Sequence, residues 1–316
     1  MRIALQKDIV VLKKNRRLKR REHAYGFCTA LIPIIGFLLF SLAPMIISMW
    51  MSFQQPADGN LRFEQMTFVG WHNYSYVLTD SKFWTAVGDT MLNCLVTPLC
   101  MIFGLIIAML VSNPKLRGRT VFKVLFFLPY VCSVVATCSI WKMLLNPTFG
   151  PFNAFLKSIG LPPIDMLNPS MTMPVMIFLG VWTGVGFSVI MYCAALTSID
   201  SGVVEASKVD GANKWHRFWH VTFPGVMPVS FFLLITGIIG NLQDFTRYQI
   251  LIPAGSNRGV TIAYYLYNKL TDTSASTASI SGAGVASAAS WCLTILIIAI
   301  TTIQFMANKK QGDVTK

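Results

Sequence analysis

The residues whose types and spacing have the clearest chemical meaning lie in a charged segment at positions 200–224. Asp200 and Ser201 can cap a helix beginning near residue 203, because their side-chain oxygens accept hydrogen bonds from the first free backbone N–H groups. Glu205 then falls in the first turn, where the helix dipole favours a carboxylate. Gly211 can take a positive φ angle without steric cost and reverse the chain. The pattern predicts a helix, a glycine turn and a second helix.

The second helix is expected from about Lys214, and it places three aromatic side chains on one side: Trp215, Phe218 and Trp219. Aromatic side chains facing water are costly unless a partner or the lipid headgroup region covers them. The chemistry of this segment is therefore recognition of a partner. His216 and His220 have the spacing of helical metal ligands, but no third ligand accompanies them, so no metal site is expected.

A second group of residues is polar or aromatic and lies inside apolar stretches: Tyr130, Trp182, Thr183, Tyr192, Asn241, Asp244, Arg247 and Tyr248. Polar groups are expensive in hydrocarbon, so they need a functional or structural reason. Aromatic faces pack on sugar rings, and amides and carboxylates bind hydroxyl groups, so this set suits a carbohydrate. Asn241, Asp244 and Tyr248 are predicted to share one face of a single helix, at i, i+3 and i+7.

Structural explanations for these residues stay open. Tyrosine and tryptophan often mark membrane interfaces, and Asn241 can bond to another helix. Arg247 can reach the outer headgroups, pair with Asp244, or select an anionic solute such as a uronate or a phosphate ester. The seven cysteines all fall inside apolar stretches and form no Cys-x-x-Cys pair, so they are read as packing residues.

The elements that hold these residues are predicted to be six membrane-spanning helices. The chain has 316 residues, of which 54% are hydrophobic and 12% charged, and a soluble domain usually carries about twice that charge fraction. A span needs about 20 mostly apolar residues. Six stretches qualify: residues 24–53, 83–112, 124–145, 171–199, 221–243 and 273–308. We expect an all-α, polytopic membrane protein.

The orientation follows from the lysines and arginines, of which eighteen lie on the side of the chain termini and five on the opposite side. We therefore expect a basic cytoplasmic tail at 1–23, a transmembrane domain at 24–308 and a cytoplasmic tail at 309–316. Segment 200–224 is cytoplasmic as well. The net charge of +13 lies beside the spans, where it sets topology and meets anionic lipid, so no nucleic acid partner is expected.

Three connections are expected on the outer side. Residues 54–82 are predicted to form a short hairpin or helix, and the proline- and glycine-rich residues 146–170 a loop. Residues 273–281 are read as a loop leading into the last span. Beyond them, Gly284 and Ala288 are small enough to let two helices approach closely.

Segment 200–224 closely resembles the EAA coupling loop of permease subunits of ABC (ATP-binding cassette) importers. The motif reads Glu205-Ala206-Ser207, Asp210-Gly211-Ala212, Phe218 and Pro224. Ser207 replaces the usual second alanine. Residues 68–74, 126–130 and 141–150 resemble segments of sugar permeases, whereas 250–261 depart from the usual glycine-rich run. The resemblance covers nearly the whole chain and favours the maltose-permease-like group.

This resemblance implies a type I ABC importer permease fold in the inner membrane of a bacterium. It assigns contact with the ATPase to Glu205, Ala206, Ser207, Asp210, Gly211, Ala212 and Phe218. It assigns the solute pathway to Tyr130, Gly180, Thr183, Gly184, Phe187, Gly237, Asn241 and Asp244, to which the helix-face pattern adds Tyr248. The implied partners are a second homologous permease, two ATPase subunits and an external solute-binding protein. ATP would be bound by the partners, so this chain is expected to be neither an enzyme nor the holder of a cofactor.

Three alternative functions are weighed against this one. An ABC permease could carry a non-sugar solute such as a glycerophosphate or a uronate. An ion-coupled secondary transporter would need buried titratable pairs and an inverted repeat, and the sequence offers few of the former and none of the latter. A membrane enzyme would need a cluster of nucleophile, base or metal ligands, and the four scattered histidines do not provide one.

Overall fold

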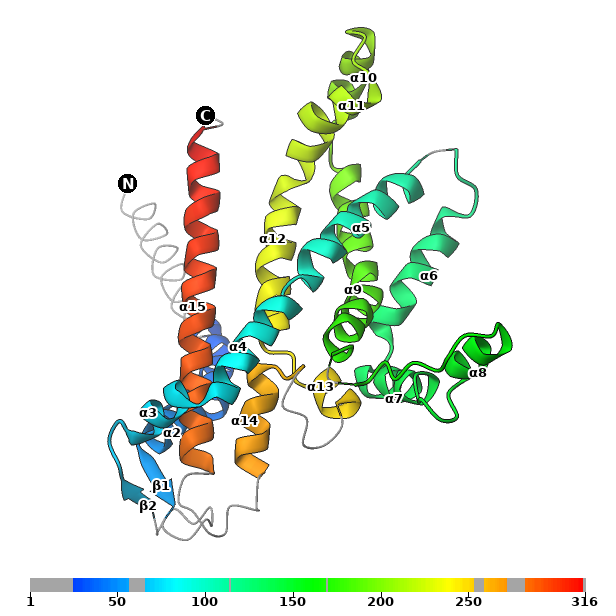
Figure 1. The fold of residues 1–316 in the computed structure, drawn as a ribbon. Coiled ribbons are helices and arrows are strands. Elements are labelled where there is room, and N and C mark those ends of the chain that lie inside the picture. The colour runs from blue at the N-terminus through cyan, green and yellow to red at the C-terminus, as the bar shows by residue number, and fades with distance from the viewer. Residues whose placement is uncertain are drawn as a thin grey trace, which may run out of the picture.

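The computed structural model describes residues 25–56, 66–113, 115–168, 170–252, 259–271 and 282–314, with side chains up to residue 308. The predicted tail at 1–23 and the predicted loop at 273–281 lie outside these residues. Helices dominate, as predicted (Figure 1). Five helices are long and apolar enough to cross a membrane: Tyr25–Met51, Ser81–Val111, Thr172–Thr197, Lys214–Leu242 and Ala283–Asn308. A bent pair of helices raises the number of spans to six.

That bent pair corrects the predicted third span, which was read as one helix over 124–145. Helix α6 (Arg119–Val131) starts earlier, and α7 (Val134–Leu144) follows at 90° to it. The chain turns because Cys132 and Ser133 both take non-helical torsions, with ψ of 145° and 127°. Both residues are compatible with an apolar helix in hydropathy, so the sequence pattern concealed the break.

The bundle is built on helix α9 (Thr172–Thr197), which packs against α5 (Val96–Val111) and α6. Small residues make the close approach possible. A Cβ atom on Gly104 would lie 2.5 Å from the Cβ of Ser188, and one on Gly186 would collide with the backbone of Phe126. Helix α12 (Phe223–Leu242) completes this group, and Tyr192 and Val226 are buried at the contact.

One end of the bundle is closed by short elements. Strand β1 (Gln54–Pro56) pairs antiparallel with β2 (Met66–Phe68), and both the hairpin and the helix predicted for residues 54–82 are present. The other elements of this layer are α3 (His72–Thr79), α8 (Pro151–Ser158), α13 (Thr246–Leu251) and α14 (Ile262–Thr271). Helices α3 and α14 both contact α4 (Ser81–Asn93) and α15 (Ala283–Val314), and α13 packs against α7. Close packing near Gly284 is confirmed, since a Cβ there would collide with the carbonyl of Gln54, and Ala288 is fully buried.

The opposite end carries α10 (Ser201–Val209), α11 (Lys214–Arg217) and the last turns of α15 (Figure 1). The connection between α5 and α6 points the same way. Segment 200–224, the α5–α6 connection and the C-terminal helix therefore share one end of the molecule. This is the arrangement that the distribution of basic residues predicts.

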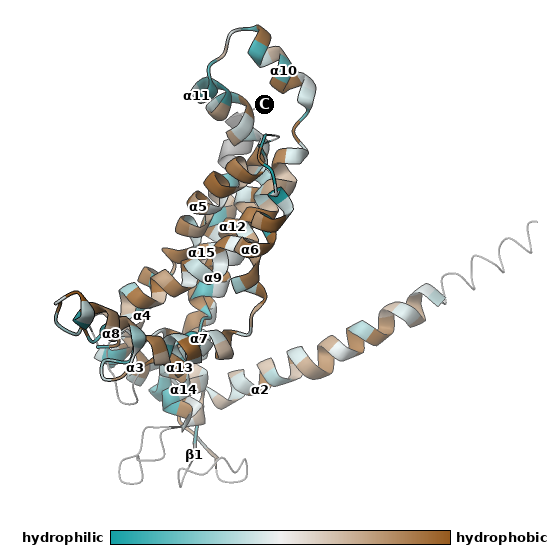
Figure 2. Cartoon of the chain, turned by 90° about the vertical axis from the view of Figure 1, so that its right-hand side faces the viewer, coloured by the Kyte–Doolittle hydropathy of each residue, from teal (hydrophilic) through white to brown (hydrophobic). Residues whose placement is uncertain are grey.

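The first span stands apart from the rest of the chain. It runs from Tyr25 through a π-helical turn, η1 (Leu38–Leu42), into α2 (Ala43–Met51), and its apolar window has no buried residue. Figure 2 shows this brown helix reaching away from the bundle. Phe40 is 82% exposed. Helix α2 contacts β1 and α15, but no residue of the span is fully buried, so lipid or another subunit must cover most of its apolar surface.

Candidate functional site

Segment 200–224, which we call the coupling segment, begins with a capped helix. The Asp200 carboxylate accepts a hydrogen bond of 2.8 Å from the Gly202 N–H, so α10 starts at Ser201, two residues earlier than predicted. Glu205, Ala206 and Asp210 are exposed along this helix and at its end. Among the residues that the structure describes, none forms a hydrogen bond or an ion pair with the Glu205 or Asp210 carboxylate, so both are accessible to a partner.

Gly211 ends α10 in the predicted way, with φ of +76°. The Gly211 N–H donates to the Lys208 carbonyl at 3.2 Å, and the Ala212 N–H donates to the Ser207 carbonyl at 3.0 Å. These two bonds form a Schellman motif, in which the residue after the helix takes a left-handed conformation. Gly211 is exposed, whereas Ser207 and Ala212 are partly buried beneath the turn.

The second helix of the coupling segment also starts where predicted. Asn213 caps α11 by accepting from the His216 N–H at 2.7 Å. The chain continues through a π-helical turn, η3 (Phe218–Thr222), into α12. The ring of Trp219 lies 5.8 Å from Trp215 and 5.2 Å from Phe218, which confirms the shared aromatic side. Trp215 is 70% exposed, so this side lacks a cover within the chain.

The predicted solute-pathway residues meet in part around a cavity of 410 Å³ between α5, α6, α9 and α12. Five residues of the predicted pathway set line it: Tyr130, Gly184, Phe187, Gly237 and Asn241. The rings of Tyr130 and Phe187 are stacked, with centroids 5.1 Å apart and planes 18° apart. The cavity therefore offers a flat aromatic surface beside a polar amide.

The sequence analysis missed other polar residues of the cavity wall: Thr97, Ser188 and Thr236. Helical spacing could have found them. Ser188 follows Gly184 by four residues, and Thr236 and Gly240 flank Gly237 on the face that carries Asn241. Hydroxyl groups at such positions were passed over because serine and threonine bond readily to their own helix in apolar surroundings.

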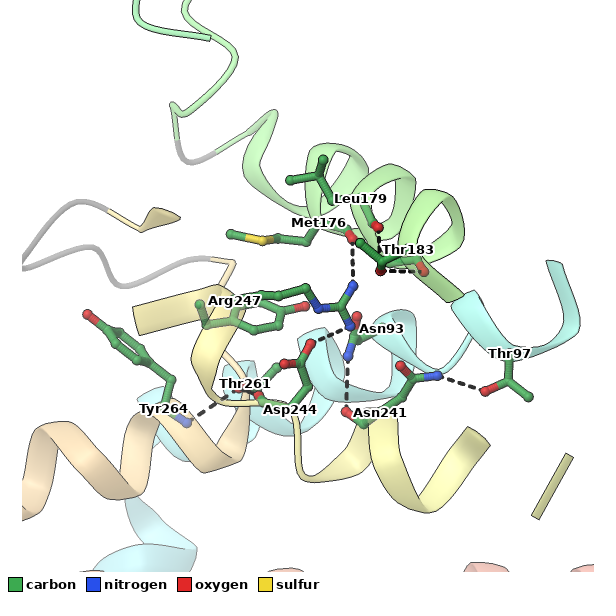
Figure 3. A network of polar contacts seen from close by, with 12 residues as sticks. Asn93, Thr97, Met176, Leu179, Thr183, Asn241, Asp244, Arg247, Thr261 and Tyr264 are labelled. Atoms are coloured by element: carbon green, nitrogen blue, oxygen red, sulfur yellow. Dashed lines mark hydrogen bonds and ion pairs between the residues drawn. The ribbon is translucent and has the colours of Figure 1, made fainter. Parts of the chain in front are cut away.

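Asn241 both lines the cavity and links helices. Its side-chain amide donates to the Thr97 hydroxyl at 2.7 Å, and its backbone carbonyl accepts from the Asn93 side-chain amide at 3.0 Å (Figure 3). The predicted alternative of a bond to another helix is therefore real, and it does not remove Asn241 from the cavity. The bond to Thr97 orients the Asn241 side chain, and the bond from Asn93 ties the end of α12 to α4.

Asp244 and Arg247 form an ion pair behind the cavity, and their side chains are only 12% and 10% exposed. The Arg247 guanidinium also donates to the Met176 carbonyl at 3.2 Å (Figure 3). Gly180 makes room for it, because a Cβ at that position would collide with the guanidinium. Of the three roles weighed for Arg247, pairing with Asp244 is the one observed. Gly180 and Asp244 do not line the cavity.

The prediction of one continuous helix for Asn241, Asp244 and Tyr248 is wrong. Helix α12 ends at Leu242 and α13 starts at Thr246, so the i, i+3, i+7 spacing does not define a face. The Thr261 hydroxyl donates to the Asp244 carbonyl at 2.8 Å and so satisfies one acceptor that the break leaves free.

The break sends Tyr248 into the core. Its side chain is fully buried, and its hydroxyl lies 3.7 Å from the Met173 sulfur. Thr183 also points away from the cavity wall, since its hydroxyl donates to the carbonyls of Leu179 and Gly180 in its own helix at 2.8 and 3.2 Å.

A second polar cluster, the outer cluster, lies at the end that carries α14. Asp80 accepts from the Tyr265 hydroxyl at 2.8 Å and pairs with Lys269 at 3.2 Å. Burial works to raise the pKa of Asp80, but the Lys82 N–H, the Tyr265 hydroxyl and Lys269 together hold that pKa below its ordinary value. Burial works to lower the pKa of Lys269, but Tyr76 and Asp80 raise it overall. Both groups are thus held in their charged forms.

Comparison with known families identifies the class of protein that has these features. Residues 100–310 match the family described as the binding-protein-dependent transport system inner membrane component. This chain belongs to that family. It is a membrane-spanning permease component of an ABC transporter, and the matched region contains the coupling segment and all of the cavity lining except Val96 and Thr97.

Full-length relatives of this inner membrane component include sugar permeases. The lactose transport system permease protein LacF of Rhizobium radiobacter is 31% identical over 301 residues, covering 93% of this chain and 97% of LacF. The trehalose/maltose transport system permease protein MalF of Thermococcus litoralis is 26% identical over 302 residues, covering 94% of this chain and 98% of MalF.

Solved structures show the same fold for this inner membrane component. A chain of a bacterial ABC transporter involved in the import of the acidic polysaccharide alginate superimposes with a TM-score of 0.78 at 24% identity. The match covers 93% of this chain and 99% of that chain. The predicted type I importer permease fold is confirmed.

Proposed function

We propose that this permease forms one half of the membrane pathway of an ATP-driven bacterial importer that carries a carbohydrate, a di- or oligosaccharide. The observation that carries the proposal is the cavity in which the stacked rings of Tyr130 and Phe187 share a wall with the Asn241 amide. Aromatic faces bind the C–H faces of sugars, and amides and hydroxyl groups bind their hydroxyls. The relatives named for lactose and for trehalose/maltose transport support the same solute class.

A neutral sugar fits this cavity better than an anionic solute. The Arg247 guanidinium is already engaged by the Asp244 carboxylate and the Met176 carbonyl. Its positive charge is therefore compensated and lies behind the cavity wall. A uronate or a phosphate ester would require this pair to open.

A second, homologous permease is proposed to complete the pathway. Two observations support it. No residue of the first span is fully buried within its own chain, and the cavity is lined by four helices of a single subunit. An external solute-binding protein would deliver the sugar to the end that carries β1, α8 and α14.

Two ATPase subunits, which bind and hydrolyse ATP, are proposed to hold the coupling segment on the cytoplasmic side, where both chain termini also lie. The exposed Glu205, the Gly211 turn and the aromatic side of α11 form the contact. Closure of the ATPases would move the segment, and α12 would transmit the motion to the cavity, because η3 joins it directly to α11. Rocking of the helices around the cavity then exposes it to alternate sides.

The test is uptake of lactose, trehalose and maltose by proteoliposomes that contain both permeases, the ATPases and the binding protein. Tyr130→Ala and Phe187→Ala each remove the stacked pair and should raise the KM for the transported sugar roughly three- to tenfold, as expected for an aromatic contact of about 0.5–1.5 kcal/mol. Phe178→Ala is the matched control, because Phe178 packs on Trp141 outside the cavity.

An unchanged KM in both cavity variants would show that the sugar binds elsewhere. The driving force is tested in the same vesicles. Uptake should require internal ATP and should persist without an ion gradient. Transport that follows an imposed ion gradient without ATP would instead establish the secondary-transporter alternative.

A further inference from the structure

A groove of 520 Å³ lies between α5 and α6, beside the connection that joins them. Its walls are almost entirely apolar. Helix α5 supplies Ile107, Leu110 and Val111, helix α6 supplies Phe122 and Phe126, and the connection supplies Asn113, Lys115 and Leu116. The groove therefore has a long apolar floor and a single cationic group at its rim.

The α5–α6 connection, which supplies part of the groove lining, lies toward the end of the molecule that carries α10 and α11 (Figure 1). Leu110 is 64% exposed, so its surface faces lipid hydrocarbon in a membrane-spanning helix of this kind. An empty apolar hollow of this size is unfavourable, because its lining loses the contacts that a filled space would provide. Hydrocarbon chains are the surrounding solvent that can fill it.

The chain segment beside the groove, residues 112–123, is strongly basic. Residues 112–123 contain no acidic residue but hold four cations: Lys115, Arg117, Arg119 and Lys123. Within the part of the chain that the structure describes, none of the four pairs with a carboxylate. The Asn113 side chain accepts from the Lys115 N–H at 3.0 Å, and its carbonyl accepts from the Leu116 N–H at 3.0 Å. The connection thus holds Lys115 and Leu116 at fixed places beside the groove.

We propose that the groove binds one acyl chain of an anionic phospholipid whose phosphate headgroup lies against Lys115 and the neighbouring arginines. Apolar walls that end at a basic rim match the two parts of such a lipid, and basic pockets between membrane helices bind anionic headgroups. A zwitterionic phospholipid fits the walls equally well but leaves the cationic rim uncompensated. The binding itself does not depend on the proposed function. The proposed function adds one point: if the coupling segment is cytoplasmic, the bound lipid belongs to the cytoplasmic leaflet.

The ligand test uses native mass spectrometry of the assembled transporter after incubation with phosphatidylglycerol and phosphatidylcholine of identical chains. The wild type should retain phosphatidylglycerol in preference. Lys115→Gln should lower its retention roughly fivefold, the effect of one headgroup contact. Lys157→Gln is the matched control, because this exposed lysine lies in α8 at the other end of the molecule.

The second test changes the size of a side chain in the groove and leaves the charge of the protein unchanged. Leu110→Trp fills the groove from an exposed position and should abolish the preferential retention. Leu125→Trp on the exposed side of α6, which does not line the groove, should leave it intact. A phosphatidylglycerol carrying a photoreactive group in its acyl chain should cross-link to residues 107–126.

Equal retention of the two lipids by the wild type would overturn the proposal, as would undiminished retention by Leu110→Trp. Cross-links of the groove residues to the second permease in place of lipid would show that a protein segment fills the groove. All of these measurements read lipid binding and not transport. Their failure is therefore separable from a failure of the sugar-importer proposal.

Discussion

At the scale of single residues, the buried ion pair of Asp244 and Arg247 is expected to stabilise the fold and not to bind the solute. Removing one partner of a buried ion pair leaves an uncompensated charge and typically lowers the free energy of unfolding by about 3–5 kcal/mol. Arg247→Met should therefore strongly lower the thermal stability of the assembled transporter in detergent. The loss should appear as a fall in the unfolding temperature even without sugar.

The double variant Asp244→Asn with Arg247→Met is the control for that prediction. It removes both charges, so its unfolding temperature should lie above that of Arg247→Met alone. Equal destabilisation by the single and double variants would mean that the charges do not interact in the folded protein. In that case Arg247 would again be a candidate for binding an anionic solute.

The cavity shows how far residues alone could predict the site. Tyr130 and Asn241 were identified because a tyrosine and an amide are unusual in apolar helices, whereas Phe187 was identified only through the resemblance to sugar permeases. Tyr248 was assigned to the same face by a spacing that is meaningful only within an unbroken helix. The break after Leu242 depends on contacts such as the Thr261 hydroxyl on the Asp244 carbonyl, which local sequence does not encode.

At the scale of elements, the glycine turn of the coupling segment makes a specific prediction. Gly211 has φ of +76°, a conformation that costs a non-glycine residue about 1–2 kcal/mol and a β-branched residue most. Gly211→Val should displace α11 relative to α10 and impair coupling. Gly211→Asn should retain most activity, because asparagine tolerates the left-handed conformation. The measurement is binding-protein-stimulated ATP hydrolysis together with sugar uptake in the reconstituted complex.

Wild-type rates for Gly211→Val would contradict the role given to this turn. Glu205→Arg tests the contact itself and not its geometry, since Glu205 is exposed and its replacement leaves the Schellman bonds intact. This variant should weaken co-purification of the ATPase subunits. The two variants therefore distinguish a distorted segment from a segment that has lost its partner.

The elements were predictable where hydropathy or capping chemistry decides them. The two ends of α10 were predicted from Asp200 and Gly211, which act locally, whereas the cap that Asn213 provides for α11 was not identified from the sequence. The 90° bend between α6 and α7 was not predictable, because both halves are apolar and no glycine or proline occupies the turn at Cys132 and Ser133. The direction of α7 is set by its packing on α13, far away in the sequence.

At the scale of the whole molecule, the two ends are built differently. The coupling segment projects from one end with its aromatic side uncovered, and the first span projects from the bundle with no buried residue. The other end is consolidated by the outer cluster, in which Tyr265 reaches Asp80 across 185 positions of the sequence. One end of the molecule is thus held together by contacts within the chain, whereas the coupling segment and the first span present apolar surfaces that other subunits or lipid can cover.

The outer cluster should make the stability of the whole molecule depend on pH at the acid end. The folded-state pKa of Asp80 is held below its ordinary value, so its stabilising contribution is complete above that value and is lost as pH falls through the folded-state pKa. The pKa of Lys269 is raised, so its contribution persists through neutral pH and is lost only in strong alkali. The difference in unfolding temperature between the wild type and Asp80→Asn should be largest near neutral pH and should shrink toward pH of about 3.

Asp165→Asn is the matched control for this acid dependence, because Asp165 lies at the same end and its carboxylate accepts only from the nearby Leu167 N–H. Its unfolding temperature should follow that of the wild type across the range. If Asp80→Asn lowered the unfolding temperature equally at neutral and acid pH, the Asp80 charge would not contribute, and the Tyr265 hydrogen bond alone would hold α14 against the start of α4. A smaller loss of unfolding temperature at acid pH would show that the Asp80 carboxylate stabilises the protein through its charge. That charge then holds residues 76–80 against α14 and closes this end of the bundle.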